Sequence, residues 1–226
     1  MILAIDTSGF RCGAALWENE LIAFDESDGI HKHNEVLLGQ VQALLSENSV
    51  VPTMISAIGV SSGPGSFTGL RIGMAAAKGL CWSWNKPLIL VPTLEGLANS
   101  APTRAETVVP LMPVRANEVY WSVFQRQDGE MVRCQDDDII EIEKLPEVLR
   151  GKVFFCGDGY HKHQEKIDRL FGPNIADFSK SEQIKGLAVS TARLTESLFY
   201  QKRFSYLLEA EPQYCYSFPR QRRDAI

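Results

Sequence analysis

The fold class is decided by the stretch SAIGVSSGPGSFTG, which spans residues 56–69. Its first five residues form a short apolar run typical of a buried strand. The loop that follows is rich in Gly, Pro and Ser, and it leads into a segment without proline that predicts a helix from about Thr68 to Trp84. Pro87 ends that region, and Leu88 to Val91 predicts the next strand.

The residues before this stretch predict an antiparallel meander followed by a helix. Three strand-like runs follow one another closely, at Ile2 to Ile5, Cys12 to Trp17 and Leu21 to Asp25. Apolar residues then recur at helical spacing from His33 to Glu47. With a third helix opening at Pro92-Thr93, the order of elements predicts a mixed α/β fold in which helices cover a sheet.

The second half of the chain predicts a smaller set of strands and one long helix. The strands are expected at Val108 to Val114, Val119 to Arg126, Met131 to Cys134 and Val153 to Cys156, and the helix at Ile184 to Tyr200. Pro102 and Arg104 stand in a plausible boundary, so we expect two units, residues 1–104 and 105–226.

Composition excludes several classes of protein. The chain has 226 residues, 45% hydrophobic and 23% charged, with a formal net charge of −5, which argues against a generally basic nucleic-acid coat. No run approaches the roughly 18 apolar residues that a membrane span needs. The five cysteines show no C-x-x-C spacing, which is typical of reduced thiols in a cytoplasmic protein.

Asp6, Thr7 and Ser8 form the first candidate site. They follow an apolar strand, where hydroxyls and backbone N–H groups can hold a phosphate and a carboxylate can hold a cation or a water. The same three residues can equally satisfy an ordinary turn. A weak nucleotide or phosphate site at this turn is therefore one of two open interpretations.

Two helices carry the second candidate site, a partner interface. Gly69, Gly73 and Ala77 recur at four-residue steps, so one face of their helix lets another backbone approach closely. Leu37, Val41 and Leu44 give the preceding helix an apolar stripe, which neighbouring apolar residues widen. This face either docks a partner or packs on its own sheet. The preceding helix has more apolar surface than one contact would bury, which favours the partner.

Other motifs give weaker signals. The pairs His31/His33 and His161/His163 lack a third ligand at metal-binding spacing, and no G-x-S-x-G motif is present. The basic segment with Arg220, Arg222 and Arg223 is typical of a solvated tail, and the alternative is that it contacts RNA.

With these residues in place, the chain resembles the TsaB (YeaZ) family. The segment G-P-G-S-F-T-G-L-R-I-G, from Gly63 to Gly73, matches the most distinctive segment of that family without a break. The start at Ile2 to Ser8, the H-N-E-V-L-L run from His33, and two weaker landmarks at Glu118 and Glu211 add support. Pro113-Val114-Arg115 departs from the Asp-Ala-Arg that the family usually carries.

The resemblance implies an actin/Hsp70/sugar kinase-like (ASKHA) fold with two related subdomains. It also implies a cytoplasmic role in making threonylcarbamoyladenosine in tRNAs that read ANN codons. The expected partners are the catalytic paralogue TsaD, the ATPase TsaE, tRNA through the complex, and a second copy of the chain when TsaD is absent. The two helices described above would form the docking surface, and no cofactor is expected.

The resemblance also allows a test of catalytic competence. TsaD carries an H-x-x-x-H pair that holds its metal, and Thr93 and Leu97 stand at the matching positions here. Leu cannot bind a metal, so we expect a non-catalytic subunit. A self-sufficient phosphotransferase or ATPase using Asp6 is the alternative, and a peptidase is a third. An Asp at Gly73 is expected to abolish docking without unfolding the chain.

Overall fold

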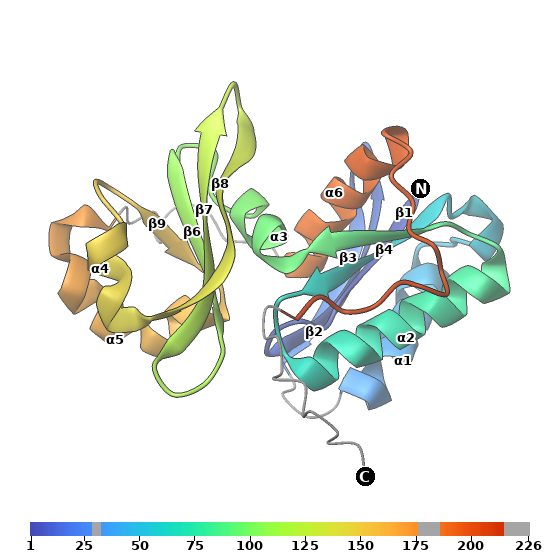
Figure 1. Cartoon of the computed structure of the whole chain (residues 1–226). Helices are drawn as coiled ribbons and strands as arrows, with labels where there is room; N and C mark the ends of the chain where they lie inside the picture. Colours follow the sequence, from blue (N-terminus) through green and yellow to red (C-terminus); the bar gives the residue numbers. More distant parts are fainter. Residues whose placement is uncertain (29–32, 176–185, 215–226) are drawn as a thin grey trace, which may run out of the picture.

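The computed structural model describes residues 1–28, 33–175 and 186–214, and it folds the chain into two lobes (Figure 1). The first lobe is built on a five-stranded sheet with strand order β3-β2-β1-β4-β5. β2 and β3 pair antiparallel, as do β1 and β2, whereas β4 lies parallel to both β1 and β5. These strands span Ile2–Asp6 (β1), Arg11–Glu18 (β2), Glu20–Asp28 (β3), Ala57–Gly63 (β4) and Leu88–Pro92 (β5).

Helices cover both faces of this sheet. α1 (His33–Glu47) and α2 (Phe67–Trp84) pack on one face, and α6 (Leu187–Tyr200) packs on the other. The Ser66 side chain caps α2 by accepting a hydrogen bond from the Gly69 N–H at 3.2 Å, and Asn85 ends the helix in the left-handed conformation. The apolar residues of α1, α2 and the sheet form one buried core.

The second lobe repeats this plan with a four-stranded sheet of order β8-β7-β6-β9. An antiparallel meander of three strands again precedes a parallel fourth strand beside the first one. α3 (Thr93–Asn99) covers the face toward the first lobe, and α5 (Asp158–Phe171) covers the other. The remaining elements are β6 (Thr107–Pro113), β7 (Glu118–Gln127), β8 (Glu130–Glu141), α4 (Leu145–Val148), β9 (Phe154–Cys156) and three single 3-10 turns at Pro52–Met54, Ile142–Lys144 and Gly172–Asn174.

Two mixed sheets of matching topology, each flanked by helices, confirm the expected ASKHA fold with related subdomains. The predicted meander and the predicted α1, α2 and β4 are confirmed within a few residues. β8 runs to Glu141, well beyond the predicted end at Cys134. α5 was not predicted, because its first eight residues are mostly polar and show no apolar stripe. In the structure, His163 interrupts the helical geometry of α5.

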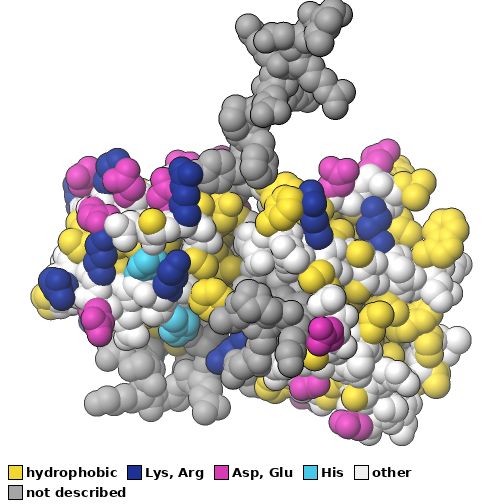
Figure 2. Space-filling view, turned by 90° about the horizontal axis from the view of Figure 1, so that it is seen from below, with side chains coloured by type: hydrophobic (Ala, Val, Ile, Leu, Met, Phe, Trp, Pro, Cys, Tyr) yellow, Lys and Arg dark blue, Asp and Glu magenta, His cyan; other side chains and the backbone are white. Residues whose placement is uncertain are grey.

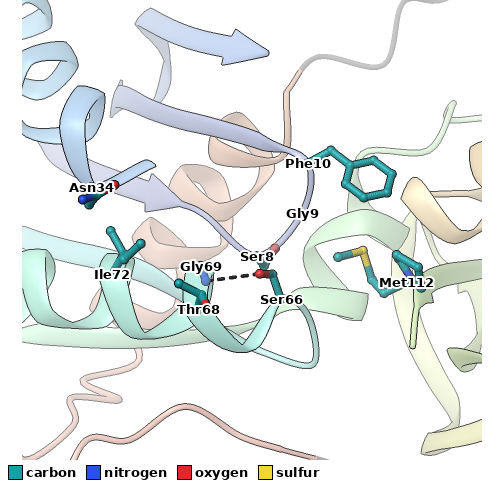
Figure 3. A pocket seen from close by; sticks show the side chains of 10 residues that line it. Ser8, Gly9, Phe10, Asn34, Ser66, Thr68, Gly69, Ile72 and Met112 are labelled. Atoms are coloured by element: carbon teal, nitrogen blue, oxygen red, sulfur yellow. Dashed lines mark hydrogen bonds between the residues drawn. The ribbon is translucent and has the colours of Figure 1, made fainter. Parts of the chain in front are cut away.

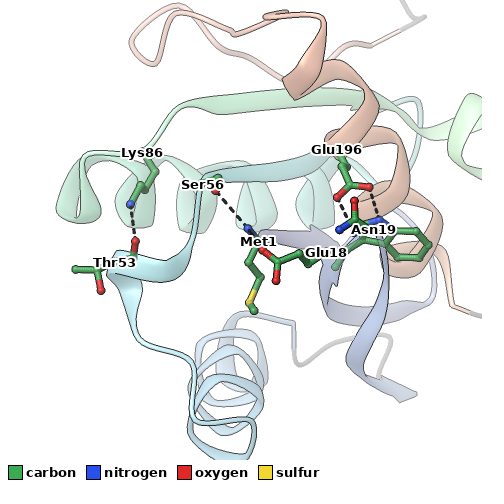
Figure 4. A network of polar contacts seen from close by, with 8 residues as sticks. Met1, Glu18, Asn19, Thr53, Ser56, Lys86 and Glu196 are labelled. Carbon is green, nitrogen blue, oxygen red and sulfur yellow. Dashed lines mark hydrogen bonds and ion pairs between the residues drawn. The ribbon is translucent and has the colours of Figure 1, made fainter.

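The expected division into residues 1–104 and 105–226 needs a correction. The chain returns to the first lobe at α6, where Glu196 accepts hydrogen bonds from the Trp17 ring N–H at 2.7 Å and from the Asn19 backbone at 2.8 Å (Figure 4). Farther on, the Gln213 N–H donates to the Ser62 carbonyl oxygen at 2.6 Å. Residues 187–214 therefore belong with the first lobe, because α6 covers the face of its sheet that α1 and α2 leave open.

Candidate functional site

A cavity of about 510 Å³ opens between the lobes, beside the β1–β2 turn and the first turns of α1 and α2. Figure 3 shows Asn34 and Ile72 on one side of it and Phe10 and Met112 on the other. The described residues therefore give the cavity hydroxyl groups, an amide and apolar walls, and no ionisable side chain. Its lining residues are Ser8, Gly9, Phe10, Asn34, Ser66, Thr68, Gly69, Ile72, Met112 and Pro113.

The turn formed by Asp6, Thr7 and Ser8 borders this cavity, and all three side chains are buried. One oxygen of the Asp6 carboxyl group accepts hydrogen bonds from the Ser8 hydroxyl at 2.7 Å and from the Ser8 N–H at 3.2 Å. The Thr7 hydroxyl donates to the Gly69 carbonyl oxygen at 2.7 Å. These side chains therefore bind their own turn and the start of α2.

The start of α2 lies directly against this turn. The Ser66 N–H donates to the Ser8 carbonyl oxygen at 2.7 Å. A Cβ atom at Gly69 would overlap the Thr7 carbonyl oxygen, and one at Gly73 would overlap the Thr7 hydroxyl. The glycines at these two positions are therefore required by a close contact within the chain.

The six positions expected at a partner interface all face inward. Their side chains or Cα atoms are buried in the core between the first sheet and its two helices: Leu37, Val41, Leu44, Gly69, Gly73 and Ala77. This corrects the expectation that these residues form the partner interface. The apolar residues recur at helical spacing because that face of each helix packs in the core of the chain itself. Docking on these helices has to use their other faces.

The outer faces of α1 and α2 do reach the surface, where Figure 2 shows hydrophobic side chains over this lobe. Leu38 on α1 is 55% exposed, and Trp82 near the end of α2 is 75% exposed. Gly39 and Gly79 are exposed, and a Cβ atom at either would meet no other atom within 4 Å. Unlike Gly69 and Gly73, these two helical glycines are not explained by packing against any residue that the structure describes.

Burial raises the pKa of Asp6 above its ordinary value of 3.8, and the nearby charge of Asp158 raises it further. Hydrogen bonds from Ser8 and Ser61 act in the opposite direction but are outweighed. Folded chains therefore keep the Asp6 proton to a higher pH than unfolded chains do. It follows that the contribution of Asp6 to stability decreases as the pH rises from its ordinary pKa through the raised one.

Asp6→Asn is expected to flatten this pH dependence. An amide can still accept the hydrogen bonds from Ser8, but it has no buried charge to develop as the pH rises. The free energy of unfolding, measured with urea between about pH 4 and pH 7, should therefore fall less with pH in the variant than in the unchanged chain. Asp128→Asn, in an exposed turn, is the control. Equal pH slopes for Asp6→Asn and the unchanged chain would contradict the prediction.

Thr93 and Leu97, which the resemblance sets against the metal-binding pair of TsaD, are both buried. The Thr93 hydroxyl accepts a hydrogen bond from the Gly63 N–H at 3.1 Å, and Leu97 packs in the core of the second lobe. Among residues 1–28, 33–175 and 186–214, no three His, Cys, Asp or Glu side chains gather as a metal site would require.

Sequence reasoning missed one feature beside the cavity. Gly157-Asp158-Gly159 follows β9 and brings the Asp158 carboxylate to the β1–β2 turn, where it accepts a hydrogen bond from the Phe10 N–H at 2.6 Å. The signal was present in the sequence, since two glycines around an aspartate after an apolar strand resemble a ligand-facing loop.

Two remaining expectations concern the tail and the membrane. Arg220, Arg222 and Arg223 lie outside the described residues, so their contact with RNA stays a prediction. Glu211 to Tyr214, at one of the weaker family landmarks, have no regular secondary structure. Within the described part of the chain, no helix combines the length and hydrophobicity needed to cross a membrane.

Comparison with known proteins gives a consistent result. A family model described as "TsaD: tRNA N6-adenosine threonylcarbamoyltransferase" matches residues 27–221. The tRNA threonylcarbamoyladenosine biosynthesis protein TsaB of Bacillus subtilis is 31% identical over 76% of this chain and 76% of its own. TsaB of Haemophilus influenzae is 30% identical over 94% and 92%. The solved structure of YeaZ from Pseudomonas aeruginosa has a TM-score of 0.79 at 28% identity, covering 94% of this chain and 98% of that one.

Proposed function

The chain belongs to the TsaB family and acts in tRNA threonylcarbamoyladenosine biosynthesis, and we propose that it is a non-catalytic subunit that binds and activates the transferase TsaD. In this proposal TsaE joins the pair, and the modified tRNAs are those that read ANN codons. When TsaD is absent, the same surface pairs two copies of the chain.

The observation that carries the proposal is the outer face of α1 and α2. A glycine in a helix interior costs about 1 kcal/mol relative to alanine, and no neighbour among the described residues requires one at Gly39 or Gly79. Small residues on an exposed helix face permit close approach by the backbone of a partner. Leu38 and Ala75 lie on the same two helices and add apolar surface that is exposed to water in the free chain.

Two further observations support a role without chemistry of its own. Thr93 and Leu97 give the chain no replacement for the metal-binding pair of the catalytic paralogue. Among the residues that the structure describes, no lysine or arginine lines the cavity between the lobes, so these residues offer no cation to the phosphates of ATP. We therefore place the transfer reaction in TsaD.

The net charge of −5 bears on the tRNA. A polyanion is repelled by an acidic chain unless a local basic patch outweighs the overall field. The proposal therefore assigns most of the tRNA affinity to the assembled complex.

The test is reconstitution of the modification from purified parts. TsaD, TsaE, an activated threonylcarbamoyl donor and an unmodified tRNA are combined with and without this chain, and the modified nucleoside is measured. We expect modification only when the chain is present, and none from the chain without TsaD. Full activity without the chain would contradict the proposal, as would metal-dependent ATP hydrolysis by the pure chain that Asp6→Ala abolishes.

A further inference from the structure

The Asp158 carboxylate makes one of the polar contacts between the two lobes. Asp158, the first residue of α5 in the second lobe, accepts a hydrogen bond from the Phe10 N–H of the β1–β2 turn at 2.6 Å. A Cβ atom at Gly9 would overlap the Asp158 carboxylate oxygen, so this approach is open only because residue 9 is glycine. The contact thus joins residues that lie 148 positions apart in the chain.

The backbone around Asp158 is shaped to hold the carboxylate in this place. Gly157 has a φ of +89°, and Cβ atoms at Gly157 or Gly159 would press on the backbone of Leu111 in β6. Both glycines therefore let the loop pack closely against β6, and the end of β6 lines the cavity. With Gly9, three glycines on two separate segments make the contact between Phe10 and Asp158 sterically possible.

The β1–β2 turn presents its N–H group as an anion-binding turn does. Backbone N–H groups at such turns bind phosphate oxygens, and a charged acceptor makes the hydrogen bond shorter and stronger. Here the acceptor is a side chain of the protein. A phosphate on the Phe10 N–H would have to displace Asp158 and lie against its negative charge.

The other charged groups nearby do not offset that repulsion. Asp158 shares a second, smaller cavity of about 140 Å³ with Asp6, Glu26, Arg11 and His161. The Arg11 guanidinium forms an ion pair with Glu26 at 3.0 Å, so its charge is already balanced by a carboxylate. Among the described residues that line this smaller cavity, acidic groups thus outnumber basic ones.

We infer that the Asp158 carboxylate is an internal ligand of the β1–β2 turn. There it contributes to the contact between the two lobes and excludes phosphate groups from the N–H group of the turn. The inference does not depend on binding of TsaD. It accounts for an aspartate between two glycines beside the β1–β2 turn. It also predicts a latent phosphate site that a single substitution uncovers.

The experiment compares three variants of the full chain with the unchanged chain. Asp158→Ala removes the acceptor and the charge, whereas Asp158→Asn keeps an acceptor of the same size without the charge. Glu165→Gln removes one negative charge from an exposed position of the same helix and is the control. Binding of inorganic pyrophosphate and of MgADP is measured by calorimetry, and exchange of the Phe10 amide hydrogen by mass spectrometry or NMR.

Asp158→Ala should bind pyrophosphate at least about tenfold more tightly than the unchanged chain. Its Phe10 amide should also exchange at least about tenfold faster, because the hydrogen bond is lost. Asp158→Asn should slow that exchange relative to Asp158→Ala, and Glu165→Gln should match the unchanged chain in both measurements. Faster exchange without a gain in pyrophosphate binding would overturn the exclusion of phosphate. Unchanged Phe10 exchange in Asp158→Ala would overturn the link between the lobes.

Discussion

Leu38→Glu is expected to weaken binding of this chain to TsaD by about 100-fold or more while leaving its own fold intact. Leu38 is 55% exposed, so a carboxylate at this position stays hydrated in the free chain. In the proposed complex the same carboxylate would be buried against apolar side chains without a partner, which is costly. Calorimetry or surface plasmon resonance with purified TsaD measures the loss, and thermal unfolding of the variant alone checks the fold.

Leu170→Glu is the matched control for this experiment. Leu170 lies on α5 of the second lobe and is 40% exposed, so the chemical change and the degree of exposure are nearly the same. The control should bind TsaD as the unchanged chain does. Equal weakening by both variants would point to a general effect of charge, and no weakening by Leu38→Glu would remove the outer face of α1 from the interface.

The experiment also separates the two faces of the docking helices. Periodicity in the sequence identified Leu37, Val41 and Leu44 as one stripe of α1, but it does not reveal which object the stripe touches. The structure shows that the stripe faces the first sheet. Leu38 follows Leu37 by about 100° around the helix, so it lies outside the buried stripe and on the exposed face of α1.

The fold could be predicted further than the site. Short apolar runs, turn residues and helical spacing located the first lobe almost element by element, because each signal is local. α5 was missed because only Ile167 and Phe171 near its end are buried large apolar residues, which leaves no clear stripe at its start. The return of α6 to the first lobe was missed because no local signal says on which sheet a helix packs.

The role of the glycines shows the same limit in detail. Gly69, Gly73 and Gly79 all lie on α2, and their spacing puts the first two on one face without showing what that face touches. In three dimensions the first two lie against Thr7, whereas Gly79 has open space around it. The contact between Asp158 and Phe10 was beyond prediction for a related reason, since it depends on how the lobes are placed relative to each other.

Gly73→Asp is therefore expected to destabilise the chain by about 3 kcal/mol or more, contrary to the expectation from sequence that it would spare the fold. Its Cβ atom would overlap the Thr7 hydroxyl, which is itself buried and hydrogen-bonded to the Gly69 carbonyl oxygen. The added carboxylate would be buried in the same place, and burial of an unpaired charge adds to the cost. Urea unfolding followed by circular dichroism measures the difference.

Gly79→Asp is the matched control on the same helix. The substitution is identical, but residue 79 is exposed and no atom lies within 4 Å of its Cβ position. Because glycine and aspartate are both poor helix formers, we expect a change in stability of less than about 1 kcal/mol. Equal unfolding midpoints for the two variants would contradict the close contact between Gly73 and Thr7. If Gly73→Asp unfolds readily and Gly79→Asp does not, failure of Gly73→Asp to bind TsaD is explained by loss of the folded state. Gly79→Asp is then the variant that tests docking through α2.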